Sequence, residues 1–93
     1  MAILKRVSDG KGDMGARSEA ISWNEDGTLK EVVGRYPTVG CSLLVGSVTA
    51  RSYSDKDYWM TTEVTEIIEE RIEKAGDKYF KFKTGNSIYE YWG

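Results

Sequence analysis

Three observations predict an all-β fold for this chain, specifically a small SH3-like barrel of about five to six strands. β-Branched and aromatic residues alternate with polar ones in short runs, most clearly over 43–53 and 88–92. Turns rich in glycine and asparagine separate these runs. A chain of 93 residues with 40% hydrophobic content can form one compact core, so we expect a single domain over 1–93.

The N-terminal part begins with a possible short strand over 2–4 and continues into a glycine-rich segment. Residues 8–15 carry three glycines and two aspartates, which is typical of irregular structure. We therefore expect residues 8–19 to form a mobile loop.

A hairpin is predicted next, because strand-like runs over 20–23 and 28–33 flank the dipeptide Asp26-Gly27. Glycine supplies the positive φ that such a turn requires. The run over 43–53 is the clearest strand of the chain, and a polar turn over 54–57 follows it.

The segment 61–75 can be interpreted in two ways. Val64, Ile67 and Ile72 follow helical spacing, and Thr62 with Gly76 could mark the helix ends, which gives an α+β alternative with one helix near 62–75. β-Branched residues over 61–68 instead favour a strand that pairs with 79–83. We prefer the strand because most of the chain reads as β structure.

Composition excludes several kinds of catalytic site. The chain has no histidine and one cysteine, Cys41, so His-based acid–base catalysis, Cys-His nucleophiles and a disulfide-stapled scaffold are ruled out. Cys41 lies among apolar residues, and we expect a buried, inert thiol. Carboxylate pairs such as Glu69 and Glu70 have no positioned nucleophile nearby, so we interpret them as a solvated face. We expect no enzyme activity, no metal and no cofactor.

Charge is nearly balanced, with 13 basic and 15 acidic residues and a net charge of −2. This balance makes duplex DNA an unlikely partner. Basic side chains gather near the N-terminus, and acidic ones gather over 63–73. The two groups are either solvated surfaces or the two sides of a head-to-tail contact, and the small size also favours a homo-oligomer.

No apolar run approaches membrane-spanning length, and the N-terminus has no secretory h-region. We therefore expect a cytoplasmic protein.

Hydroxyl and amide side chains form two clusters inside aromatic and β-branched runs. Such groups need hydrogen-bond partners when they are buried, so they either line a binding site or close turns. If 62–68 pairs with 79–83, both clusters lie at one end of the barrel, beside two aromatic faces that suit a nucleobase, sugar or phosphate-containing ligand. The candidate ligand-binding residues are Arg51, Trp59, Thr61, Thr62, Thr84, Asn86, Ser87 and Tyr89.

The same region carries a family resemblance. The pattern W-M-T-T-x-V-T-E-I from Trp59, followed by F-x-T-x-N-S-x-Y from Phe82, resembles short uncharacterised bacteriophage proteins. The resemblance covers about the last half of the chain and implies a phage origin and a small β-rich fold. Several small phage proteins of this size act against host defence, either by binding a host protein or by sequestering a nucleotide signal.

Two functions follow as expectations. The preferred one is a non-enzymatic, phage-type counter-defence protein that sequesters a small nucleotide-like signalling ligand at the polar and aromatic end. The alternative is an inhibitor or adaptor that binds a host protein or a nucleic acid through a sheet face or the basic N-terminal segment.

Overall fold

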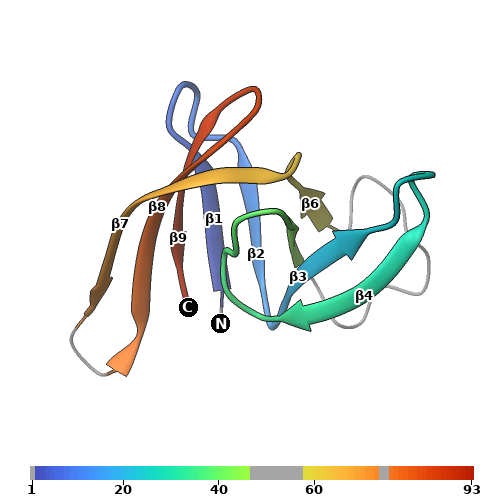
Figure 1. Ribbon diagram of the computed structural model, residues 1–93. Helices are drawn as coiled ribbons and strands as arrows, with labels where there is room; N and C mark the ends of the chain where they lie inside the picture. The colour runs from blue at the N-terminus through green and yellow to red at the C-terminus, as the bar shows by residue number, and fades with distance from the viewer. Residues whose placement is uncertain (1, 47–57, 74–75) are drawn as a thin grey trace.

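The computed structural model describes residues 2–46, 58–73 and 76–93, and these residues form two antiparallel sheets with no α-helix (Figure 1). The first sheet has the strand order β2-β1-β9-β8-β7, and the second has the order β4-β3-β5-β6. The strands of the first sheet are β1 (Ala2–Arg6), β2 (Gly12–Gly15), β7 (Val64–Ile72), β8 (Lys78–Thr84) and β9 (Ile88–Trp92). Those of the second are β3 (Arg17–Trp23), β4 (Leu29–Gly34), β5 (Ser42–Gly46) and β6 (Tyr58–Met60).

The all-β prediction is confirmed, and the helix alternative near 62–75 is wrong. The described residues contain nine strands rather than five to six, because several strands are only three to five residues long. β7 pairs antiparallel with β8, with Val64 opposite Thr84 and Ile67 opposite Phe82. The expected pairing of 62–68 with 79–83 is therefore confirmed in its main part.

The helix-like spacing in β7 has a structural cause. The register shifts between Val64 and Glu66 and again between Ile67 and Glu69, so one extra residue is inserted at each place. Val64 and Ile67, the two residues of β7 that pack against the core, are therefore three residues apart, as in a helix, instead of two. Periodicity cannot distinguish a doubly bulged strand from a helix here.

The loop expected over 8–19 is largely strand. β2 pairs with β1, with Gly12 opposite Lys5, and β3 begins at Arg17. A Cβ on Gly12 would collide with the carbonyl oxygen of Leu4, so glycine at this position permits the close strand approach. Glycine in this segment thus allows β2 to pack closely against β1.

The hairpin centred on Asp26-Gly27 is confirmed. Gly27 has a φ of +87°, and its N–H donates to the Asn24 carbonyl at 3.0 Å. The Asp26 carboxylate accepts hydrogen bonds from Thr28, which lowers the pKa of Asp26. The strand expected over 43–53 begins as β5, and its remainder, with the turn over 54–57, lies outside the described residues.

The hydrophobic core lies between the two sheets and is rich in aromatic rings. Its buried members are Ala2, Leu4, Leu43, Val45, Val64, Phe80, Phe82, Tyr89 and Tyr91. One of them also links the sheets by hydrogen bonds, since the Tyr91 hydroxyl lies 2.8 Å from Ser18 Oγ on β3. It also donates to the Arg35 carbonyl at 3.3 Å. Tyr91, in the central strand of the first sheet, therefore hydrogen-bonds the second sheet through its hydroxyl.

Candidate functional site

A shallow depression opens at the turn between β8 and β9. Its volume is about 410 Å³, and it is lined by Val7, Ser8, Lys83, Gly85, Asn86, Ser87 and Ile88. The segment after β1 reaches this turn because the Val7 N–H donates to the Ile88 carbonyl at 2.9 Å and so extends the β1–β9 pairing. The depression thus joins the segment that follows β1 to the turn between β8 and β9, which are far apart in the sequence.

The turn itself is closed by a threonine. Thr84 is 1% exposed, and its Oγ1 donates to the Ser87 carbonyl at 3.2 Å. The same oxygen accepts from the Ser87 N–H at 3.2 Å, and the Thr84 N–H donates to the Ser87 carbonyl at 2.8 Å. Gly85 does not adopt a positive φ, so the hydroxyl of Thr84, rather than a left-handed glycine, closes the turn.

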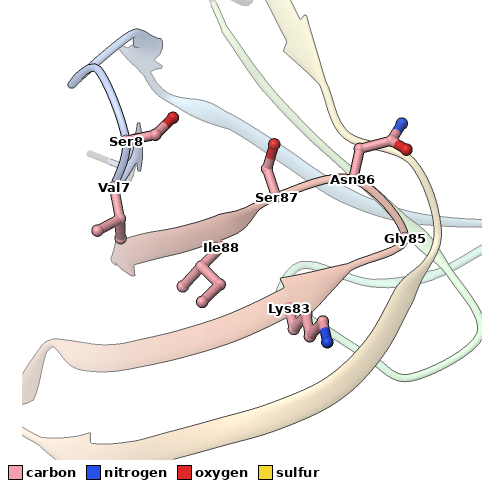
Figure 2. Close-up of a pocket in the computed structure, with 7 residues that line it drawn as sticks. All are labelled: Val7, Ser8, Lys83, Gly85, Asn86, Ser87 and Ile88. Atoms are coloured by element: carbon pink, nitrogen blue, oxygen red, sulfur yellow. The ribbon is translucent and has the colours of Figure 1, made fainter.

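The side chains around the depression extend to two sides of the turn. In Figure 2 the polar groups of Ser8, Ser87 and Asn86 extend to one side of the turn, and the side chains of Val7, Ile88 and Lys83 extend to the other. Within the described part of the chain, the Asn86 side-chain amide has no hydrogen-bond partner, although the Asn86 backbone N–H approaches Thr84 Oγ1 at 3.4 Å. The donors and acceptors of this amide are therefore available to a ligand.

Trp59 and Tyr89, the aromatic candidates, contact each other and do not line this depression. The Trp59 Nε1–H donates to the Tyr89 hydroxyl at 3.3 Å, and the Tyr89 ring stacks on Phe82 with centroids 5.6 Å apart. The Arg6 guanidinium lies 5.0 Å from the centroid of the Trp59 ring. Tyr89 is 5% exposed, so its ring serves mainly the core.

Arg6 is also bound by an acidic neighbour. Its Nη2 lies 2.6 Å from Asp9 Oδ2, and its Nε donates to Asp9 Oδ1 at 3.0 Å. The hydrogen bond from Arg6, followed by that from the Lys11 backbone, lowers the pKa of Asp9 to about 2. Arg6 therefore faces Trp59 as part of an ion pair.

The remaining candidates divide between structural use and exposure. Thr61 is buried, and its Oγ1 accepts from the Leu43 N–H at 3.0 Å and donates to the Thr62 carbonyl at 2.7 Å. Thr62 is exposed. Arg51 lies outside the described residues. Asn86 and Ser87 therefore line one opening, whereas the hydroxyls of Thr61 and Thr84 hydrogen-bond backbone groups.

Sequence reasoning missed five lining residues, namely Val7, Ser8, Lys83, Gly85 and Ile88. Lys83 and Ile88 flank the predicted turn, and the alternation over 79–83 and 88–92 could have identified them as neighbours. The β1–β9 pairing places Val7 and Ser8 at the depression, and no local sequence pattern predicts that pairing.

A second concave surface lies on the outer face of the second sheet. This groove has a volume of about 550 Å³ and is lined mostly by apolar residues, namely Arg17, Glu19, Ile21, Trp23, Leu29, Val32, Leu44, Tyr58 and Met60. Ile21 and Leu44 are buried, whereas Leu29 is 57% exposed and Val32 is 51% exposed. The Trp23 Nε1–H donates to Ser42 Oγ at 2.9 Å, so the polar edge of this indole is satisfied within the chain.

Several charged side chains in the two clusters form ion pairs within the chain. In the basic N-terminal segment, Arg17 Nε lies 3.1 Å from Glu19 Oε1, and Arg6 pairs with Asp9. In the acidic segment, Arg71 contacts both Glu69 and Glu73. These pairs reduce the field that the basic segment could present to a nucleic acid.

Cys41 is buried as expected, at 6% exposure. Burial, and to a smaller extent the charges of Glu63 and Glu31, raise the pKa of its thiol. The thiol form therefore dominates at neutral pH, which disfavours nucleophilic attack by this side chain.

Within the described residues, no three His, Cys, Asp or Glu side chains are grouped so that they could hold a metal ion. The same residues contain no helix long and apolar enough to cross a membrane. No protein-family model matches the chain, and neither a curated protein nor a solved structure matches it.

Proposed function

We propose that this protein is a non-enzymatic binding protein that holds a small nucleotide-like ligand in the depression at the β8–β9 turn. The observation that carries the proposal is that Ser8, Asn86 and Ser87 line one depression and extend their polar groups to the same side of the turn, while Lys83 lines the same depression from the side of Ile88. An amide can read the edge of a base, hydroxyls can bind a sugar, and an ammonium group can pair with a phosphate.

The resemblance to phage proteins gives this binding a biological setting. In that setting the protein acts in the host cytoplasm against a defence response, by sequestering a nucleotide signal. Sequestration requires binding alone and no catalytic group. The raised pKa of the Cys41 thiol agrees with this, as does the pairing of Arg71 with Glu69 and Glu73 on the carboxylate-rich strand β7.

The fold proposed for this function is the SH3-like barrel. Two features support closure of the sheets. Only Ala16 separates β2 of the first sheet from β3 of the second. On the other side, the Val64 N–H donates to the Cys41 carbonyl at 2.9 Å and the Gly40 N–H donates to the Val64 carbonyl at 2.9 Å, which joins β7 to the segment before β5.

The test is a calorimetric titration with uridine and adenosine monophosphates and their cyclic mono- and dinucleotide forms. We expect at least one of these probes to bind and to be recovered intact. Asn86→Ala and Lys83→Met should each weaken its binding by about 1–3 kcal/mol, the loss expected for a hydrogen bond to a charged or buried group. Lys30→Met, which removes the same charge from the second sheet, should leave binding unchanged.

The same variants distinguish a ligand site from turn chemistry. The Asn86 side-chain amide makes no hydrogen bond to another described residue, so Asn86→Ala should lower binding without lowering the melting temperature. A lower melting temperature with unchanged binding would assign Asn86 to the fold. The absence of binding across the whole probe series would refute the proposal.

A second candidate is an inhibitor or adaptor that binds a host macromolecule. The exposed apolar groove of the second sheet favours a protein partner over a nucleic acid, since aromatic and aliphatic side chains line most of it. The ion pairs of Arg6 and Arg17 weaken the case for the basic N-terminal segment.

A further inference from the structure

β4 is an edge strand whose surface suits another strand. All of its residues are exposed, and within the described chain it pairs only with β3. Leu29, Val32 and Val33 are each more than half exposed, at 57%, 51% and 51%. An exposed apolar edge is a template for pairing with a strand of another chain.

We propose that a second copy of this chain pairs antiparallel with β4, so that the second sheets of two molecules form one continuous sheet. This contact is independent of the ligand depression, which lies on the first sheet. In this dimer the β4 side of the groove forms part of the interface between the two copies.

Charge complementarity selects the second copy and fixes the register. Lys30 and Glu31 are adjacent at the edge, and neither is in an ion pair within the described residues. In a two-fold antiparallel pair, one register places Lys30 opposite the partner's Glu31 and, by symmetry, Glu31 opposite the partner's Lys30. A shift to either neighbouring symmetric register places Lys30 opposite itself or Glu31 opposite itself, which is repulsive.

The same register also matches the apolar residues. It places Leu29 opposite the partner's Val32, and both residues line the groove, so both lie on the same face of the second sheet. They share a face despite their spacing of three because the β3–β4 register shifts between Ser22 and Trp23. The bulge thus makes the edge self-complementary on its groove side.

The other long edge, β7, is poorly suited to self-pairing. Its sequence VTEIIEERI contains three glutamates and one arginine, and that arginine already pairs with Glu69 and Glu73. Two such strands would bring excess negative charge together. β4, with one lysine and one glutamate, carries no net charge.

The test is sedimentation equilibrium of the full chain over micromolar to submillimolar concentration, with charge-swap variants. The parent protein should show a monomer–dimer equilibrium. Lys30→Glu and Glu31→Lys should each raise the dimer dissociation constant about tenfold, because each replaces two attractive pairs by repulsive ones. The double swap should restore dimerisation, and an equimolar mixture of the two single variants should form a heterodimer.

Two further variants separate the edge from the rest of the groove. Val32→Ser should weaken the dimer, whereas Met60→Ser, which alters the groove away from β4, should not. A single-chain mass for the parent at all concentrations would overturn the proposal and would show that the bulges and Lys30 protect the edge instead. Failure of the double swap to restore a dimer lost in the single swaps would overturn the register.

Discussion

Tyr79 illustrates how a single side chain on β8 combines three interactions. It is 3% exposed, and its hydroxyl donates to Glu90 Oε2 on β9 at 2.7 Å. The Arg71 guanidinium lies 4.0 Å from its ring centroid, and the Trp92 ring lies 5.4 Å away. Burial, followed by the hydrogen bond to Glu90, raises the pKa of Tyr79 to about 12.

Tyr79→Phe should therefore lower the free energy of unfolding at neutral pH by about 1–2 kcal/mol, since the Glu90 carboxylate loses its donor. The pH dependence has a definite sign. The pKa of Tyr79 is higher in the folded chain than its ordinary value of 10.0, so its stabilising effect is complete below pH 10 and is lost as the pH rises toward 12. Chemical denaturation of both proteins from pH 8 to 12 should show their difference shrinking over that window. A constant difference would contradict the assignment.

Residue-level sequence reasoning found part of the candidate site for a clear reason. Asn86 and Ser87 were predicted because hydroxyl and amide side chains cluster between two β-prone runs that carry aromatic residues. Thr61 and Thr84 have the same chemistry, yet their hydroxyls hydrogen-bond neighbouring backbone groups and are buried. Residue type alone does not reveal which of these hydroxyls faces solvent, because that depends on which strands lie alongside.

Among the strands, the predictions succeeded where turn residues mark a hairpin and failed where a glycine-rich composition or β-bulges obscure the strand pattern. The β3–β4 hairpin and the β8–β9 turn join neighbouring segments, and short-range turn signals identified both. β2 pairs with β1 across a glycine-rich segment whose composition resembles a loop. In β7, two bulges replaced the period of a strand with one that resembles a helix.

The β1–β2 contact leads to a test at this scale. Gly12→Ala would place a Cβ against the Leu4 carbonyl, and the backbone must shift to accommodate it. We expect a loss of about 2–3 kcal/mol in the free energy of unfolding. Gly34→Ala is the matched control, because Gly34 lies in β4 with open space around the corresponding Cβ and should show little change. Equal effects of the two substitutions in urea denaturation would contradict the close approach of β2 to β1.

For the whole molecule, the shared core and the links at Tyr91 and Val64 predict one cooperative unfolding unit. Trp23 lies in the second sheet and Trp92 in the first, so each can report on its own sheet. Variants that retain only one of these indoles, with phenylalanine at the other tryptophan positions, should each show a fluorescence midpoint that coincides with the midpoint from far-UV circular dichroism. Two separate midpoints within one variant would show that the sheets unfold independently.

The position of β1 has a further consequence for how the chain reaches this structure. β1 lies between β2 and β9 in the first sheet, with Ile3 opposite Trp92, so nearly the full length of the chain separates two paired residues (Figure 1). The β7–β8 and β8–β9 pairs involve consecutive strands and can form early, whereas the β1–β9 pair must close a very long loop. Leu4, at the centre of β1, becomes fully enclosed only when that pairing forms. The hydrophobic core is thus completed by a slow, long-range closure, and before that step Phe82 and Tyr91 remain open to contacts with other chains.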